Sequence, residues 1–318
     1  MKPRILVVGS SNTDMIIKME RIPRPGETII GGEFTSAAGG KGANQAVGAA
    51  RAGGAVTLVA RIGQDMFGDK AVAGFIADGI NVDYIVCDRT SPSGVALIFV
   101  GQNGENSIAV ASGANAKLTP ADVQKAKGAF RGVSVLLLQL ETPLDTVQAA
   151  AELAAAADAR VILNPAPARP LPDKLLRRLY LLTPNESEAE LLTGVAVDNV
   201  DGAAKAADAL LARGVQNVII TMGARGAWVA GEGIRQVIPA FKVKAVDTTA
   251  AGDVFNGALA LALAEGKPLL EAARFASAAA AISVTRMGAQ TSAPTRKEIE
   301  RLLATGKKAI TLDACNES

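Results

Sequence analysis

Short uninterrupted runs of apolar residues alternate along this chain with segments of helical periodicity, and this alternation limits the fold most. Such runs, followed by polar turns, are typical of strands buried on both faces. The expected strands span residues 5–8, 56–60, 133–140, 161–163, 179–182 and 218–221. The expected helices span residues 42–52, 67–78, 143–157, 186–192, 200–213, 251–264, 269–286 and 295–303. This order predicts a three-layer α/β fold, with helices on both faces of a mostly parallel sheet.

Two stretches, at about residues 14–37 and 92–112, depart from this rhythm. The first holds prolines and glycines between short β-prone runs, and the second has apolar runs on either side of the turn Gly101-Gln-Asn-Gly104. Both predict antiparallel hairpins inserted into the α/β core. At the loop ends of the sheet they would form a small β lid, although plain edge strands explain them equally well. We expect residues 1–318 to form a single domain with these insertions.

The chain contains no histidine. This excludes a Ser-His-Asp triad and a histidine-ligated zinc site, so any general base must be Asp, Glu, Lys, Tyr or Cys. The 33 Lys and Arg residues and the 31 Asp and Glu residues give a formal net charge of +2. This near balance gives no electrostatic reason to expect nucleic acid or a membrane as a partner. The two cysteines, Cys87 and Cys315, favour a reducing compartment, so we expect a cytoplasmic protein.

A glycine-rich motif, Gly39-Gly-Lys-Gly-Ala-Asn44, stands directly before an expected helix. Its glycines allow the backbone to approach a ligand closely, and the free amides at the helix start favour oxygen-rich or anionic ligands. Lys41 adds a positive charge, and the Asn44 amide both donates and accepts hydrogen bonds. The spacing is not that of a Walker A loop. A glycine-rich turn with a solvated lysine is the alternative interpretation.

A second motif, Asp247-Thr-Thr-Ala-Ala-Gly252-Asp253, joins an expected strand end near Val246 to the next helix. The amides of residues 250–253 would point outward as an anion nest, and Gly252 would leave room for a substrate oxygen. A carboxylate in the first turn, as in Asp253, can accept a hydroxyl proton during phosphoryl transfer. The alternative is an aspartate that only complements the helix dipole.

Polar residues follow several expected strands at one edge of the predicted sheet. Because parallel strands place their carboxyl ends at the same edge, we expect these residues to surround a hydroxyl-rich ligand. Capping and turn formation explain each of them taken singly. They are Ser11, Asn12, Asp14, Gln139, Glu141, Thr142, Asn164, Asn185, Glu186, Glu188, Thr221 and Gly223.

The two motifs resemble the two signatures of the ribokinase-like (PfkB) carbohydrate kinase family in sequence, order and spacing. Asn12-Thr-Asp14 and Asn185-Glu-Ser-Glu188 also fit, so the resemblance covers essentially the whole chain. It implies the ribokinase-like three-layer α/β/α fold with a small β lid. It also implies ATP-dependent phosphorylation of D-ribose at O5, which gives ribose 5-phosphate and ADP. Mg²⁺ and an activating monovalent cation, usually K⁺, belong to that implied activity.

The resemblance also implies roles for single residues. Asp253 would act as the base, and the amides of Ala250, Ala251 and Gly252, with its own, would stabilise the transferring phosphoryl group. The residues around the sugar would be Asn12, Asp14, Gly40, Lys41, Asn44, Glu141 and Asp253. Those that organise magnesium and ATP would be Asn185, Glu188, Thr221, Gly223, Arg225, Gly226, Gly252 and, beside the adenine, Ser277. Those of the monovalent-cation loops would be Asp247, Thr249, Ser283, Arg286, Gly288 and Ser292.

The chain departs from the family pattern at Val254, where ribose kinases commonly have threonine, so a polar contact near the nest would be missing. Two other functions stay open. One is a kinase for another small sugar or a nucleoside, such as deoxyribose or a ketohexose. The other is a catalytically silent sugar-binding regulator. The family resemblance and the exposed apolar β faces expected on the lid predict a homodimer through the lid strands.

Overall fold

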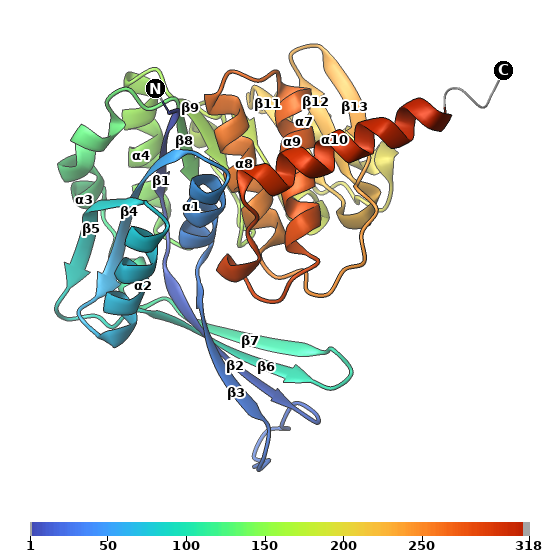
Figure 1. The fold of residues 1–318 in the computed structure, drawn as a ribbon. Coiled ribbons are helices and arrows are strands. Elements are labelled where there is room, and N and C mark those ends of the chain that lie inside the picture. The colour runs from blue at the N-terminus through green and yellow to red at the C-terminus, as the bar shows by residue number, and fades with distance from the viewer. Residues whose placement is uncertain (1, 314–318) are drawn as a thin grey trace.

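A nine-stranded sheet runs through the centre of the computed structural model, which describes residues 2–313 (Figure 1). Seven strands are parallel, and β12 and β13 add an antiparallel edge. In spatial order the strands are β13 (Ile234–Ile238), β12 (Ala227–Gly231), β11 (Asn217–Thr221), β10 (Leu181–Leu182), β9 (Arg160–Leu163), β8 (Val135–Leu138), β1 (Arg4–Val8), β4 (Ala55–Gly63) and β5 (Asn81–Asp88). The predicted α/β class with a mostly parallel sheet is confirmed.

Helices cover both faces of this sheet, because successive strand residues point to opposite faces. Ile5 and Val7 pack in one buried cluster, and Leu6 and Val8 pack in another. The first cluster includes residues of α1 (Lys41–Arg51), α2 (Met66–Ala77), α8 (Ala251–Ala264), α9 (Leu269–Ser283) and α10 (Arg296–Asp313). The second includes residues of α3 (Pro120–Lys125), α4 (Leu144–Ala156), α5 (Asp173–Leu176), α6 (Glu186–Thr193) and α7 (Val200–Ala212).

A second sheet of four strands projects from one end of the molecule (Figure 1). Its order is β3 (Glu33–Gly39), β2 (Asn12–Met19), β6 (Gly94–Gly101) and β7 (Asn106–Ala111), and the β2–β6 pair is parallel. These strands come from the two stretches that the sequence marks as insertions. The second sheet leaves the core next to the carboxyl end of β1, because β2 begins four residues after β1 ends.

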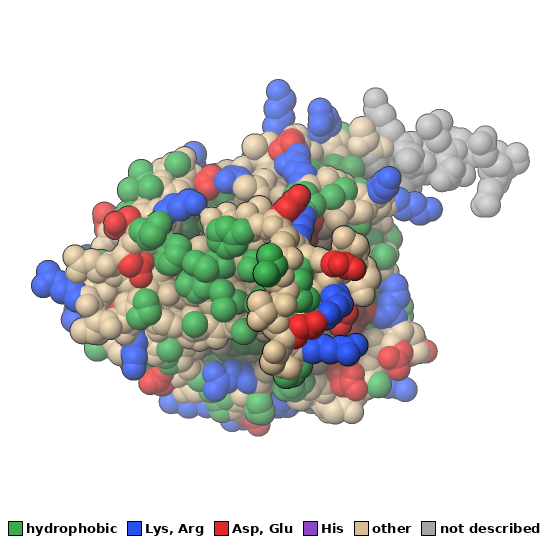
Figure 2. All heavy atoms as spheres, turned by 90° about the horizontal axis from the view of Figure 1, so that it is seen from below, with side chains coloured by type: hydrophobic (Ala, Val, Ile, Leu, Met, Phe, Trp, Pro, Cys, Tyr) green, Lys and Arg blue, Asp and Glu red, His purple; other side chains and the backbone are tan. Residues whose placement is uncertain are grey.

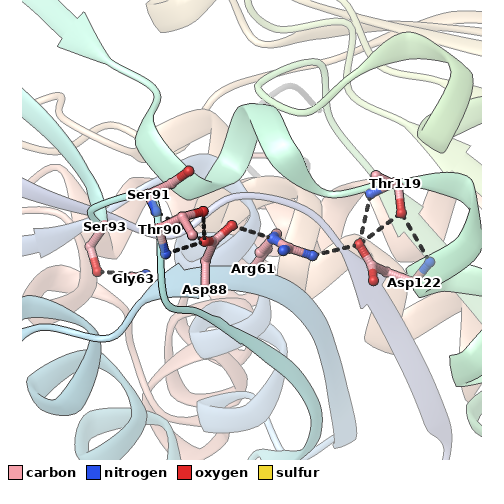
Figure 3. Close-up of polar contacts among 8 residues, drawn as sticks. All are labelled: Arg61, Gly63, Asp88, Thr90, Ser91, Ser93, Thr119 and Asp122. Atoms are coloured by element: carbon pink, nitrogen blue, oxygen red, sulfur yellow. Dashed lines mark hydrogen bonds and ion pairs between the residues drawn. The ribbon is translucent and has the colours of Figure 1, made fainter.

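Arg61 anchors the chain segment that enters the second sheet through β6 (Figure 3). Its guanidinium group lies 2.7 Å from Asp88 and 3.0 Å from Asp122, and both carboxylates are buried. Asp88 also accepts the Thr90 and Ser91 amides, and the Ser93 hydroxyl accepts the Gly63 amide at 3.0 Å. The base of this strand is therefore fixed to β4 of the large sheet.

The strand expected near Val246 is absent from the structure. Residues 239–248 form no strand, and the Val246 amide donates to the Val284 carbonyl instead of to a sheet. Residues 242–246 are all exposed, with Lys242 and Lys244 on either side of Val243, so they have no buried face that a strand could use. Among residues 2–313, no helix has the length and apolar character needed to cross a bilayer.

Candidate active site

Asp253 lies in the first turn of α8, and 6% of its surface is exposed. One carboxylate oxygen accepts the Asn44 side-chain amide at 3.0 Å, and the other accepts that of Gln45 at 3.0 Å. Burial raises the pKa of Asp253, against the opposing charge of Lys41 and these two hydrogen bonds. A buried carboxylate with a raised pKa, held by two neutral donors, is equipped to take up a proton.

Three backbone amides at the start of α8 have no hydrogen-bond acceptor within residues 2–313. Among the described residues, none accepts from the amides of Ala250, Gly252 or Asp253, whereas the Ala251 amide donates to the Thr248 carbonyl at 3.2 Å. Three of the four predicted nest amides are therefore available, and that of Ala251 is satisfied internally.

The shape around Gly252 leaves room for a ligand in front of these amides. A Cβ atom on Gly252 would meet no atom within 4 Å, so the space beside the free donors is open. The Gly252 carbonyl is held by the Asn256 side chain at 2.8 Å. Ala250 caps the helix with φ 58°, a left-handed conformation that L-residues with a Cβ rarely adopt. Free amides, open space and a positive helix end together form an anion site.

The glycine-rich motif is arranged differently from the expectation of free amides at its helix start. The Lys41 amide donates to Glu141 at 2.9 Å, and the Gly42 amide donates to the Ser10 hydroxyl, which itself hydrogen-bonds Glu141. The start of α1 is thus capped from within the protein and does not offer an anion site. Gly40 has φ 88°, and a Cβ there would lie 2.6 Å from the Asn12 amide, so the turn requires glycine.

The predicted sugar residues are brought together around Lys41 and Asp253. Burial, then the charges of Glu141 and Asp253, raises the pKa of Asp14 to about 6. Asn44 is buried, and its Oδ1 has no hydrogen-bond partner, although its Nδ2 is bound to Asp253. A buried acceptor without a donor beside several carboxylates favours a hydroxyl-bearing ligand, because a hydroxyl would satisfy it.

Asn185 and Glu188 form a capping box at the start of α6. The Asn185 side chain accepts the Glu188 amide at 2.8 Å, and the Glu188 carboxylate accepts the Asn185 amide at 2.9 Å. Burial raises the pKa of Glu188, while Lys41 lowers it and Asp253 raises it further. The capping role explains the spacing of the pair. Because the charges of Lys41 and Asp253 both act on the pKa of Glu188, this carboxylate lies in the neighbourhood of Asp253.

The residues expected to hold ATP lie in and after β11. Thr221 bridges to Asn185, which brings the end of β11 to the start of α6, and open space surrounds the Cβ direction of Gly223. The Arg225 side chain is bound to Glu186 and to the Asp198 carbonyl. A Cβ on Gly226 would lie 2.0 Å from the Ile238 carbonyl oxygen. The packing of β12 against β13 is therefore enough to explain a glycine here, without a role in binding ATP. Ser277 is half-buried on α9, and no side-chain hydrogen bond within residues 2–313 links it to the β11 segment.

The two loops expected to hold a monovalent cation meet at the ends of α8 and α9. Asp247 accepts the Thr249 amide at 2.9 Å and the Gly288 amide at 2.8 Å. Burial raises the pKa of Asp247, but these bonds outweigh it and leave the pKa below its ordinary value. The remaining members use their side chains elsewhere: Ser283 donates to Ala280 O, Ser292 to Ala289 O, and Arg286 pairs with Glu298.

No cluster of three or more acidic or cysteine side chains suited to a metal ion occurs within residues 2–313. Backbone oxygens remain as further ligands for a hard cation near Asp247. Val254 is buried where α8 packs against Gly48 of α1, so an apolar side chain fits the position where the family commonly has threonine.

The sequence analysis missed Gln45, a buried residue that supports Asp253. Its side-chain nitrogen donates to Asp253 and, at 3.1 Å, to Asn164, and its oxygen accepts from Gln139 at 2.6 Å. The available signal was its place next to Asn44 on a helix that the motif begins. A polar side chain with no exposed surface needs partners on all sides, and those partners come from distant strands.

Comparisons with known proteins agree in one family. A family model described as pfkB family carbohydrate kinase matches residues 2–296. A ribokinase of Haemophilus influenzae is 46% identical over 298 residues, which cover 94% of this chain and 97% of that protein. A deoxyribokinase of Salmonella typhi is 39% identical over 303 residues, with coverages of 94% and 98%. The solved structure of an Arabidopsis thaliana ribokinase complexed with ribose and ATP matches with a TM-score of 0.88 at 35% identity, covering 95% of this chain and 99% of that one.

Proposed function

This chain belongs to the pfkB family of carbohydrate kinases, and on that premise we propose that it transfers the γ-phosphoryl group of ATP to O5 of D-ribose. The products are ribose 5-phosphate and ADP. The observation that carries the proposal is the start of α8, where the buried carboxylate of Asp253 lies beside free amides and the open space at Gly252.

Asp253 acts on the sugar hydroxyl. It accepts the proton of the 5-hydroxyl as that oxygen attacks the γ-phosphorus and the bond to ADP breaks. The amides of Ala250, Gly252 and Asp253 donate to the non-bridging phosphoryl oxygens, whose charge they stabilise at the helix end. Asn44 and Gln45 hold the carboxylate in place, so its position does not depend on the ligand.

The sugar lies among Asn12, Asp14, Lys41, Asn44 and Glu141 in this proposal, over the turn at Gly40. The unpaired Oδ1 of Asn44 accepts a sugar hydroxyl, and the carboxylate of Asp14 accepts another. The second sheet acts as the lid, because its strands β2 and β6 begin at Asn12 and at Gly94, directly beside the sugar residues. Closure of such a lid excludes water and limits ATP hydrolysis.

ATP lies along the end of β11 in this proposal, past Thr221 and Gly223 and towards Ser277. The residues near Asn185 fit a magnesium ion, because the Glu188 carboxylate is a buried hard-oxygen ligand with one oxygen outside the capping box. Bound there, directly or through water, the ion would neutralise phosphate charge. Arg225 is held by Glu186 and contributes to the shape of this segment.

A monovalent cation, usually K⁺ in this family, fits the loops at Asp247 and Gly288. Hard oxygen ligands suited to such an ion are the ionised carboxylate of Asp247 and the backbone oxygen of Thr249. The second loop adds backbone oxygens between Ser283 and Ser292, including that of Arg286. The loop at Asp247 leads directly into the nest at residues 250–253. Cation binding would therefore order the free amides before phosphoryl transfer.

We also infer a homodimer formed through the second sheet and a cytoplasmic setting. All of β7 is exposed, and Phe34, Leu97, Ile108 and Val110 are between 45% and 62% exposed. Figure 2 views the molecule from below and shows hydrophobic side chains grouped on that face. A second copy that pairs with the β7 edge would cover such side chains.

The cytoplasmic setting rests on the cysteines. Cys87 is exposed with no disulfide partner in the described residues, and Cys315 lies outside them. A free thiol suits a reducing compartment.

The proposal is tested by ADP release from the purified protein with ribose, deoxyribose, ketohexoses and nucleosides, each with and without K⁺. We expect ribose to give the highest kcat/KM and a 5-phosphate product, and K⁺ to raise turnover. Deoxyribose belongs in the panel because one relative is a deoxyribokinase. Ribose binding without any ADP release would overturn the kinase proposal in favour of a silent sugar-binding protein. Sedimentation of Ile108→Lys beside the unaltered chain tests the dimer.

A further inference from the structure

Asn115 lies where the second sheet rejoins the large one, and none of the roles above uses it. It is on the short 3₁₀ helix η1 (Gly113–Lys117), directly after β7, and 1% of its surface is exposed. Its Oδ1 accepts the Ser11 amide at 2.9 Å, and its Nδ2 donates to the Ser11 carbonyl at 3.1 Å. The same nitrogen donates to Asn12 Oδ1 at 2.7 Å. The side chain thus joins the end of the β6–β7 hairpin to the turn between β1 and β2.

The Ser11 main chain fixes which way round the Asn115 amide stands. A backbone N–H only donates and a carbonyl only accepts, so Asn115 must turn its oxygen to the first and its nitrogen to the second. That nitrogen also faces Asn12, which must therefore present its oxygen. The Nδ2 of Asn12 is left over, and it donates to no residue within the described part of the chain.

Close packing at Gly94 restricts any other arrangement of the pair. A Cβ on Gly94 would lie 2.1 Å from Asn12 Oδ1 and 2.3 Å from Asn115 Nδ2. The backbone of β6 therefore lies directly against the hydrogen bond between the two side chains. Because both asparagines are buried, an Asn12 amide turned the other way would set two donors against each other.

We propose that Asn115 is a positioning residue for the sugar, which turns Asn12 so that its side chain offers a hydrogen-bond donor to a sugar oxygen. The inference rests on the proposed function, in which Asn12 contacts the pentose. It adds that the Asn12 side chain selects a sugar oxygen that accepts a hydrogen bond. The orientation of the Asn12 amide is set by Asn115, which does not touch the sugar. Asn115 thereby also links sugar binding to the base of the second sheet.

The test is the steady-state kinetics of Asn115→Ala, with Asn103→Ala in the exposed β6–β7 turn as the matched control. We expect KM for ribose to rise about tenfold, equivalent to about 1.4 kcal/mol, with KM for ATP unchanged and kcat within about threefold. In an Asn12→Ala background, Asn115→Ala should add nothing to KM for ribose. A purely structural role would instead lower kcat and weaken both substrates together, additively with Asn12→Ala, and this result would overturn the proposal.

A second variant, Asn12→Asp, covers the case in which Asn115→Ala does not fold. It keeps an oxygen for Asn115 and replaces the free donor with an acceptor, which also carries a negative charge. We expect the variant to remain folded while KM for ribose rises at least about tenfold. An unchanged KM would refute the donor role. Failure of the proposed function looks different, because the unaltered chain itself would then release no ADP with ribose.

Discussion

Gly252→Ala separates the proposed phosphoryl site from the stability of the fold. Gly252 lies in the first turn of α8, where an added Cβ would meet no atom within 4 Å. Alanine therefore fits the protein without ligands, and it lowers the conformational entropy of the unfolded chain. The exchange is favourable in a helix by about 0.5–1 kcal/mol. We expect the free energy of unfolding in urea to stay the same or to rise by up to that amount.

The same methyl group would stand in the space that we assign to the transferring phosphoryl group. A displacement of about 1 Å between reacting groups costs about 10²-fold in rate. We therefore expect kcat with ribose and ATP to fall by about this factor. The dissociation constant of ribose measured without ATP should not change, because the added methyl group stands in the space for the phosphoryl group, whereas most of the residues that hold the sugar lie on β2 and α1. Coupled ADP release and isothermal titration on the same preparation provide both numbers.

Gly74→Ala on α2 is the matched control, since a Cβ there also meets nothing within 4 Å and the residue is exposed. It should match the stability change of Gly252→Ala and leave kcat unaltered. If Gly252→Ala keeps kcat within about twofold of the unaltered chain, the phosphoryl group does not lie where we place it. If it unfolds more easily than the control, the space at Gly252 is not open.

Three further changes test other parts of the structure. Burial and two neighbouring carboxylates raise the pKa of Asp14 to about 6, so the ionised group lowers the free energy of unfolding as the pH rises through that value. Asp14→Asn should therefore raise Tm at about pH 8 and raise it much less at about pH 4. The same variant should raise KM for ribose. Arg61→Met leaves two buried aspartates without a cation, so it should lower Tm at neutral pH more than Arg235→Met, which opens an exposed pair. Ala250→Gly relieves a left-handed residue, which favours the folded chain by about 1–2 kcal/mol, and raises the entropy of the unfolded chain, which offsets about 0.5–1 kcal/mol. It should therefore stabilise the chain in urea by up to about 1 kcal/mol.

The parts of the fold that the sequence predicted are those whose burial is visible in consecutive residues. β1 and β11 are apolar because helices cover both faces, and the expected helices match α1, α4 and α7 to within about two residues. β5 was missed because it lies at the sheet edge and mixes Asp and Asn with apolar residues. The strand near Val246 was wrong for the opposite reason, since exposed valines on a loop imitate a strand.

The site was predictable where it depends on local geometry and not where it depends on tertiary contacts. The position of Asp253 in the first turn of α8 follows from its motif. The partners of this carboxylate do not, because Asn44 and Gln45 lie more than 200 residues earlier in the chain. Likewise, no local pattern shows that Glu141 and Ser10 cap α1.

The measurement that tests the central claim most directly compares turnover and ribose binding in Asp253→Asn. Asparagine keeps the size of the side chain but cannot take the proton of the 5-hydroxyl. We predict that kcat for ribose-dependent ADP release falls by about 10²-fold or more, while ribose still binds with nearly the same dissociation constant. Turnover close to that of the unaltered chain would contradict the account, because Asp253 could then not be the group that accepts the proton.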